Sequence, residues 1–157
     1  MTPENNSRLV GRYERIHCQL AELFIKNTDP IARMATICAL LHHKMPSFFW
    51  TGFYRLNTGQ LVVGPYQGPL ACAILDGPEG VCWTSIKENT TIIVPDVHAF
   101  EGHVACDARS KSEIVVPVRE PAGNIVAVLD VDADELDVFT ETDRAGLEAI
   151  VGLVYES

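Results

Sequence analysis

The spacing of the apolar residues changes along this chain, and that change constrains the fold more than any other feature of the sequence. Between residues 9 and 24, apolar side chains recur at steps of three and four residues, which predicts one buried stripe on an amphipathic helix. A second stripe of the same spacing follows Asp29 and Pro30, a pair typical of a helix start, and ends before Pro46. The first part of the chain is therefore predicted to form two helices.

After residue 46 the pattern changes to short segments rich in β-branched and aromatic residues, which predict strands. The predicted strands cover residues 47–55, 60–64, 91–94, 112–118 and 124–132. Turn residues at 57–59 join the first two as a hairpin, and turn residues at 121–123 join the last two, so we expect antiparallel pairing. Pro117 inside a strand favours an edge position or a bulge. A last helix is predicted to begin near Thr140.

This order of elements predicts an α+β fold. We expect a central antiparallel sheet with the N-terminal and C-terminal helices grouped on one face and long loops covering the other. The 157 residues fit one domain, residues 1–157, which is long enough to bury a core without disulfides. The irregular stretch from 64 to 111 holds aromatic and aliphatic side chains, so we expect a functional segment rather than a disordered one.

The charge and the N-terminal residues limit the possible partners. A net charge of −9 argues against binding to nucleic acid, which uses clustered Lys and Arg, and against adhesion to anionic lipid. No apolar run approaches the roughly 20 residues of a membrane span, and the polar start does not resemble a signal peptide. We therefore expect a cytoplasmic protein whose five cysteines are mostly reduced.

Core filler, metal ligands and redox chemistry are the three interpretations open for these cysteines. Cys18 and Cys38 fall on or beside the helical stripes, which favours a structural role. Cys106 has basic neighbours of the kind that lower a thiol pKa, so it is either an activated nucleophile or an inert, half-buried thiol. His98, His103 and Cys106 lack the paired spacing of a zinc site, and we predict no metal site and no cofactor.

Strand parity predicts which side chains share a face, because residues two apart point the same way. One face of the first strand is predicted to carry Trp50, Gly52 and Tyr54. The opposite face, expected to be core, carries Phe49, Thr51 and Phe53.

Two carboxylates end an otherwise apolar face of the last strand. Asp130 and Asp132 share that face with two valines. Either the strand emerges into solvent there, or the pair forms a pocket floor that handles a proton or binds an ammonium group, with one pKa raised. Glu113, near the start of the preceding strand, is either a solvated end or a side chain that the loop brings near Cys106.

Five segments of the chain match the motifs of one family. They are WTGFY at 50–54, GPYQGPLACA at 64–73, GVCW at 80–83, VPDVHAFEGHVACDARSKSEIVVPV at 94–118 and VLDVDAD at 128–134. Together they resemble the free methionine-(R)-sulfoxide reductases, which are built on a GAF domain. The likeness covers roughly residues 28–152, and the segment at 94–118 is long and specific. It implies a single GAF domain with reductase activity on free methionine-(R)-sulfoxide.

The resemblance also implies roles for particular residues. The family's three characteristic cysteines fall on Cys106 as the nucleophile, Cys72 as the resolving thiol and Cys82 as an auxiliary thiol. The substrate pocket is implied to contain Trp50, Tyr54, Glu113, Asp130 and Asp132. The chain departs from the family at Trp83 and Ala133, where glycine and serine are usual, and Trp83 directly follows Cys82.

The resulting hypothesis is a thiol reduction that needs no metal or organic cofactor. Cys106 attacks the sulfoxide and becomes a sulfenic acid, Cys72 condenses with it to a disulfide, and thioredoxin or a similar dithiol reduces that disulfide. Glu113 or Asp130 supplies the proton, and Asp132 and Glu113 pair with the substrate ammonium. The first helix also suits packing against a second subunit, as a homodimer. The alternative is a non-catalytic GAF module that binds a small ligand or senses redox state.

Overall fold

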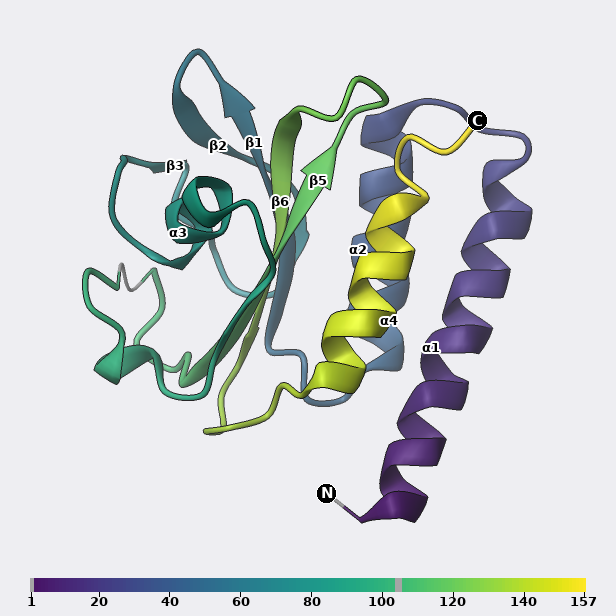
Figure 1. Cartoon of the computed structure of the whole chain (residues 1–157), viewed down its shortest axis with the longest axis horizontal. Coiled ribbons are helices and arrows are strands. Elements are labelled where there is room, and N and C mark those ends of the chain that lie inside the picture. Colours follow the sequence, from purple (N-terminus) through teal and green to yellow (C-terminus); the bar gives the residue numbers. More distant parts are fainter. Residues whose placement is uncertain (1, 104–105) are drawn as a thin grey trace.

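The computed structural model describes residues 2–103 and 106–157 and shows one sheet between two unlike layers (Figure 1). The helices are α1 (Pro3–Phe24), α2 (Pro30–Lys44), α3 (Val81–Glu88) and α4 (Glu141–Gly152), with a 3-10 turn η1 (Val97–Ala99). The strands are β1 (Trp50–Asn57), β2 (Gln60–Gln67), β3 (Ile74–Leu75), β4 (Ile92–Val94), β5 (Ser112–Arg119) and β6 (Ile125–Ala133). They run in the order β3-β2-β1-β6-β5-β4, and every neighbouring pair is antiparallel. The predicted α+β fold is confirmed.

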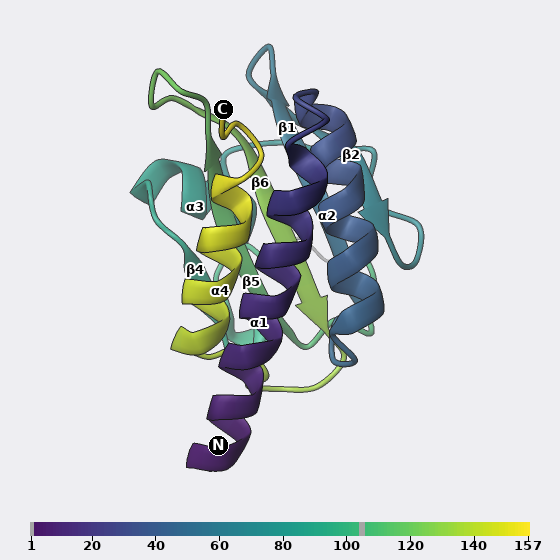
Figure 2. The same cartoon turned by 90° about the vertical axis from the view of Figure 1, so that its right-hand side faces the viewer.

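Helices α2 and α4 pack on one face of the sheet, and α1 packs against both on their outer side (Figure 1 and Figure 2). Asp29 caps α2 by accepting a 2.7 Å hydrogen bond from the Ala32 N–H. Asp143, in the first turn of α4, accepts hydrogen bonds of 2.8 Å from the Thr140 backbone and from the Tyr13 hydroxyl of α1. Because Asp143 is buried, these bonds fix the two helices against each other. Within the described residues, no helix is long and apolar enough to cross a membrane.

The sheet separates two apolar clusters, as the alternation along its strands predicts. Phe53 and Leu129 point to the helix layer and are fully buried there. Tyr54 and Val128, their direct neighbours in sequence, point to the opposite face and belong to the second cluster. Helix α3 and the long loops cover this second face, so the predicted loop layer also contains a helix (Figure 1).

Phe49 was expected in the core beside Phe53, and this expectation was wrong. Phe49 precedes the first residue of β1, so strand parity does not govern its direction. It packs against the pocket-side cluster, and the Arg109 guanidinium lies 4.9 Å from the centre of its ring. Thr51 does face the helices: it is buried, and its hydroxyl lies 3.3 Å from Nδ1 of His42 on α2.

Pro117 lies in an inner strand, and its tolerance there has a local explanation. β5 is flanked by β6 and β4, but β4 pairs with residues 113–115 and stops short of Pro117. The proline therefore removes no ladder hydrogen bond to β4. The ladder between β5 and β6 also shifts register between Val118 and Arg119, which is the bulge that the proline suggested.

Candidate active site

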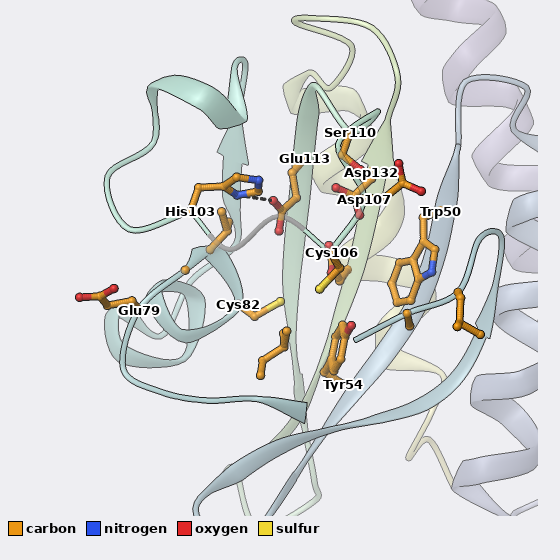
Figure 3. A pocket seen from close by; sticks show the side chains of 16 residues that line it. Trp50, Tyr54, Glu79, Cys82, His103, Cys106, Asp107, Ser110, Glu113 and Asp132 are labelled. Atoms are coloured by element: carbon orange, nitrogen blue, oxygen red, sulfur yellow. Dashed lines mark ion pairs between the residues drawn. The ribbon is translucent and has the colours of Figure 1, made fainter. Parts of the chain in front are cut away.

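A pocket opens on the loop-covered face of the sheet, between the ends of the central strands and α3 (Figure 3). The strands contribute Trp50, Tyr54, Glu113, Asp130 and Asp132 to its lining. The loops and α3 contribute, among others, Cys82, His103, Cys106, Asp107 and Ser110. The structure thus brings together residues more than 80 positions apart, from Trp50 to Asp132.

A disulfide joins Cys72 to Cys106, across 34 residues of sequence and with a Cα–Cα distance of 5.6 Å. Cys72 lies between β2 and β3, and Cys106 lies in the loop that leads from η1 to β5. The Tyr54 hydroxyl donates a 3.2 Å hydrogen bond to the carbonyl of Cys72, so a residue of the pocket wall holds one half of the disulfide in place. Cys106 lines the pocket and is exposed, so a dissolved reactant can reach this residue.

Stacked aromatic rings form one wall of the pocket. The Trp50 ring stacks on Tyr54 with centroids 5.7 Å apart and on Tyr66 with centroids 5.5 Å apart. Its indole N–H donates a 3.1 Å hydrogen bond to the Pro69 carbonyl. Any Cβ on Gly52 would collide with the Trp50 ring, so glycine at this position makes the stack possible.

Three carboxylates line the pocket beside the aromatic stack because of strand register. Glu113 of β5 lies opposite Asp132 of β6, and Trp50 of β1 lies on the other side of Asp132. Glu113 and Asp130 are 5% and 7% exposed, so neither of these two acids emerges into solvent, and Asp132 is partly buried.

Burial raises the pKa of each of these acids, since a charged carboxylate is poorly solvated there. The pKa values of Glu113 and Asp130 lie well above the usual range, and the neighbouring carboxylates add to the effect. Burial raises the pKa of Asp132 to about 7, against the lowering effect of a hydrogen bond with Ser110. The cluster therefore holds protons near neutral pH, when isolated carboxylates would have lost them.

Cys82 lies in the first turn of α3 and is 4% exposed. Burial, and then the nearby Asp130, raise its pKa well above the usual range. Sγ of Cys82 and carboxylate oxygens of Glu113 and Asp130 lie within 4.8 Å of one another, so these residues could hold a metal ion. Among the described residues, Oδ1 of Asp130 is buried without a hydrogen-bond partner, so the carboxyl group lies between these neighbours with hydrogen-bonding capacity left unfilled.

The other two free thiols lie away from the pocket. Cys18 is exposed on α1. Cys38 is buried on α2, where its Sγ lies 3.2 Å from the Pro65 carbonyl and burial raises its pKa to about 12.

Trp83, which departs from the family pattern, packs its ring over Gly77 and donates a 3.0 Å hydrogen bond to the Leu75 carbonyl. It therefore braces the loop before α3.

The sequence treated His103 only as a possible metal ligand and missed it as a pocket residue. Its Nδ1 lies 3.8 Å from Oε2 of Glu113 (Figure 3). Its Nε2 is buried, with no hydrogen-bond partner in the part of the chain that the structure describes. Burial and then the nearby His98 lower its pKa. The sequence held one indication that His103 lies in the pocket, which is its position three residues before Cys106. Ser110 was missed as well, because nothing in the local pattern links a loop serine to Asp132.

The chain matches a family model described as "GAF domain" over residues 28–154. It is 38% identical over 139 residues to "Free methionine-R-sulfoxide reductase" of Escherichia coli, covering 88% of this chain and 84% of the relative. It is 43% identical over 144 residues to "GAF domain-containing protein A" of Dictyostelium discoideum, covering 91% and 90%. A crystal structure of a free methionine-R-sulfoxide reductase of Neisseria meningitidis in complex with its substrate matches with a TM-score of 0.86 and 36% identity, covering 91% of this chain and 86% of that one.

Proposed function

The chain belongs to the GAF domain family and, within it, to the free methionine-R-sulfoxide reductases, and from this premise we propose that it reduces free methionine-(R)-sulfoxide with Cys106 as the nucleophile. The observation that carries the proposal is the Cys72–Cys106 disulfide beside an acid-lined pocket. It is the bond expected after a nucleophile has been oxidised by its substrate and resolved by a second thiol.

The two walls of the pocket suit the two ends of the reacting group. The stacked Trp50 and Tyr54 rings offer an apolar, polarisable surface to the methyl group and the sulfur. The buried Glu113 and Asp130 face this region with raised pKa values, so either can donate a hydrogen bond to the sulfoxide oxygen. Asp132, whose pKa is about 7, and Glu113, which lies opposite it in the sheet, pair with the substrate ammonium.

The proposed reaction conserves oxygen and electrons. The Cys106 thiolate attacks the sulfoxide sulfur while one carboxyl proton moves to the oxygen. The oxygen passes to Cys106, which becomes a sulfenic acid, and methionine leaves with the electron pair. The Cys72 thiol then attacks the sulfenic sulfur, forms the disulfide and releases water.

An external dithiol of the thioredoxin type completes the cycle by reducing the disulfide to two thiols. The exposed position of Cys106 supports this step, since a protein reductant needs access to one sulfur. Cys82 is proposed as an auxiliary thiol. Its burial and raised pKa keep its thiol protonated in this conformation, and a protonated thiol is a poor nucleophile.

The decisive experiment measures methionine formation from free and peptide-bound R and S sulfoxides with thioredoxin as the reductant. We expect turnover of the free R form alone. Binding of free methionine-(R)-sulfoxide without formation of methionine would contradict the proposal and favour a non-catalytic GAF module. Equal turnover of peptide-bound substrate would instead indicate a general peptide reductase.

A further inference from the structure

The side chain of His103 has two features that the proposed reaction does not explain. Its Nε2 is buried with no hydrogen-bond partner among residues 2–103 and 106–157, and a buried polar atom of this kind usually has a ligand or water as its partner. Its Nδ1 faces Oε2 of Glu113 at 3.8 Å, beyond the range of a hydrogen bond. The ring is therefore held beside the acid cluster with its donor capacity unused.

The charges around the pocket make His103 the natural partner for an anion. The lining includes the carboxylates of Glu79, Asp107, Glu113, Asp130 and Asp132. Among the lining residues that the structure describes, His103 is the one basic side chain. A free amino acid brings a carboxylate into this acidic site, and that group needs a donor away from the acids.

Arg109, on the same loop as Cys106, is already engaged elsewhere. Its guanidinium donates hydrogen bonds of 2.9 and 2.7 Å to Asp107 and lies over the Phe49 ring. A substrate carboxylate that recruited Arg109 would have to break this arrangement. Binding at His103 breaks no such hydrogen bond, because its Nε2 has no partner among the described residues.

The spacing of His103 and Glu113 also matches an amino acid. The ammonium and carboxylate of a zwitterion are carried by one carbon atom, so they need an acceptor and a donor that lie close together but are not bonded to each other. Glu113 Oε2 and the His103 ring meet this condition. The histidine need not be charged, since a neutral ring with its proton on Nε2 still donates.

We propose that Nε2 of His103 donates a hydrogen bond to the α-carboxylate of the substrate and so selects the free amino acid over a peptide. The inference rests on the proposed function and assigns a carboxylate subsite within the same pocket. In a peptide-bound sulfoxide that carboxylate is replaced by a neutral amide and the continuing chain, which weakens the hydrogen bond and crowds the site. With Glu113 taken up by the ammonium, Asp130 becomes the proton donor to the sulfoxide oxygen.

The test compares two substrates on matched variants. One substrate is free methionine-(R)-sulfoxide, and the other is its decarboxylated analogue, in which hydrogen replaces the carboxylate. We expect His103→Ala to lower kcat/KM for the free amino acid by about tenfold to a hundredfold, through KM. For the decarboxylated analogue the change stays within about threefold, because the lost contact is absent from the start. His103→Gln, which keeps an N–H donor, restores most of the loss.

His43→Gln is the matched control, because His43 is an exposed histidine near the end of α2 that does not line the pocket. It leaves both substrates unaffected. Equal losses of His103→Ala on both substrates would overturn the inference and assign His103 a purely structural role.

Calorimetric binding of methionine separates this inference from the proposed function, because it needs no turnover. If the wild-type protein forms no methionine but loses affinity for methionine on His103→Ala, the subsite stands and the proposed reaction fails. If turnover is normal and His103→Ala binds methionine as the wild type does, the reaction stands and the subsite fails.

Discussion

The two faces of the sheet are built from the same strands, but one face packs an apolar core and the other lines the pocket. On the helix face, Phe53 and Leu129 have no exposed surface and contact apolar side chains of the helix layer. On the pocket face, residues adjacent to these, Tyr54 and Asp130, line a cavity with buried acids and a disulfide. Alternation along a strand lets one segment serve both faces.

The difference between the faces is one of free energy. Burying apolar side chains stabilises the fold, whereas burying carboxylates costs free energy unless they keep their protons. The buried acids of the pocket face therefore lower the free energy of unfolding, and the same burial makes them hold protons near neutral pH. Substitutions of apolar residues on the helix face should therefore lower stability, whereas substitutions of pocket-face residues should change activity and, at the buried acids, the pH dependence of stability.

The largest expected effect is on the pocket face and on activity alone. Cys106→Ser should lower steady-state turnover below about one thousandth of the wild-type rate, because a serine hydroxyl is a poor nucleophile without an adjacent base. Its melting temperature in reducing buffer should match the wild type. Retained turnover in a coupled thioredoxin assay would remove Cys106 from the mechanism.

Cys72→Ser is the matched variant of the other disulfide partner. It should release about one equivalent of methionine rapidly and then stall with thioredoxin, because the sulfenic acid has no resolving thiol. Quenched-flow measurement of methionine per enzyme checks this. Continuous turnover would mean that Cys82 resolves the sulfenic acid after a movement of α3.

On the helix face, Phe53→Ala should lower the free energy of unfolding by about 3–5 kcal/mol, since it leaves a cavity in a fully buried site. Urea titration followed by fluorescence measures the change. Phe49→Ala, on the pocket side and only partly buried, should cost clearly less. A similar cost for both would contradict the division between the faces.

Asp132 should make stability depend on pH. Its pKa is raised by burial to about 7, so the folded state binds a proton that the unfolded state has released. Stability should therefore fall as pH rises from about 4 to about 7 and stay lowered above that. Asp132→Asn, which has no proton to lose, should exceed the wild type by about 1–3 kcal/mol at pH 8 and by little at pH 4. Parallel stability curves for the two proteins would show that other groups carry the dependence.

The smallest expected effect is at Tyr54. Tyr54→Phe removes the hydrogen bond to the Cys72 carbonyl and leaves the ring stack intact. Disulfide formation after one turnover should slow by about two- to tenfold, the value of one ordinary hydrogen bond. Stability should change by less than about 1 kcal/mol. Alkylation of unreacted thiols at timed intervals measures the rate, and an unchanged rate would mean that the bond does not position Cys72.

Much of this architecture could be predicted from the sequence because its signals are local. Helical spacing predicted α1 and α2, and parity placed Trp50 with Tyr54 and Asp130 with Asp132. The prediction was wrong at Phe49, which lies just outside β1, where the alternation of side chains along a strand no longer applies. It also missed α3, because an eight-residue helix in a loop-rich stretch gives too short a periodic pattern.

By itself, the sequence determined the type of each long element and the face on which each strand residue lies, since both follow from periodicities within a few residues. The resemblance to a family, not periodicity, paired Cys72 with Cys106. Only the tertiary structure decided that Glu113 lies opposite Asp132 and that His103 faces Glu113. These contacts depend on the register between strands and on the path of long loops. The raised pKa values depend on them too, because burial and neighbouring charges are properties of the folded chain.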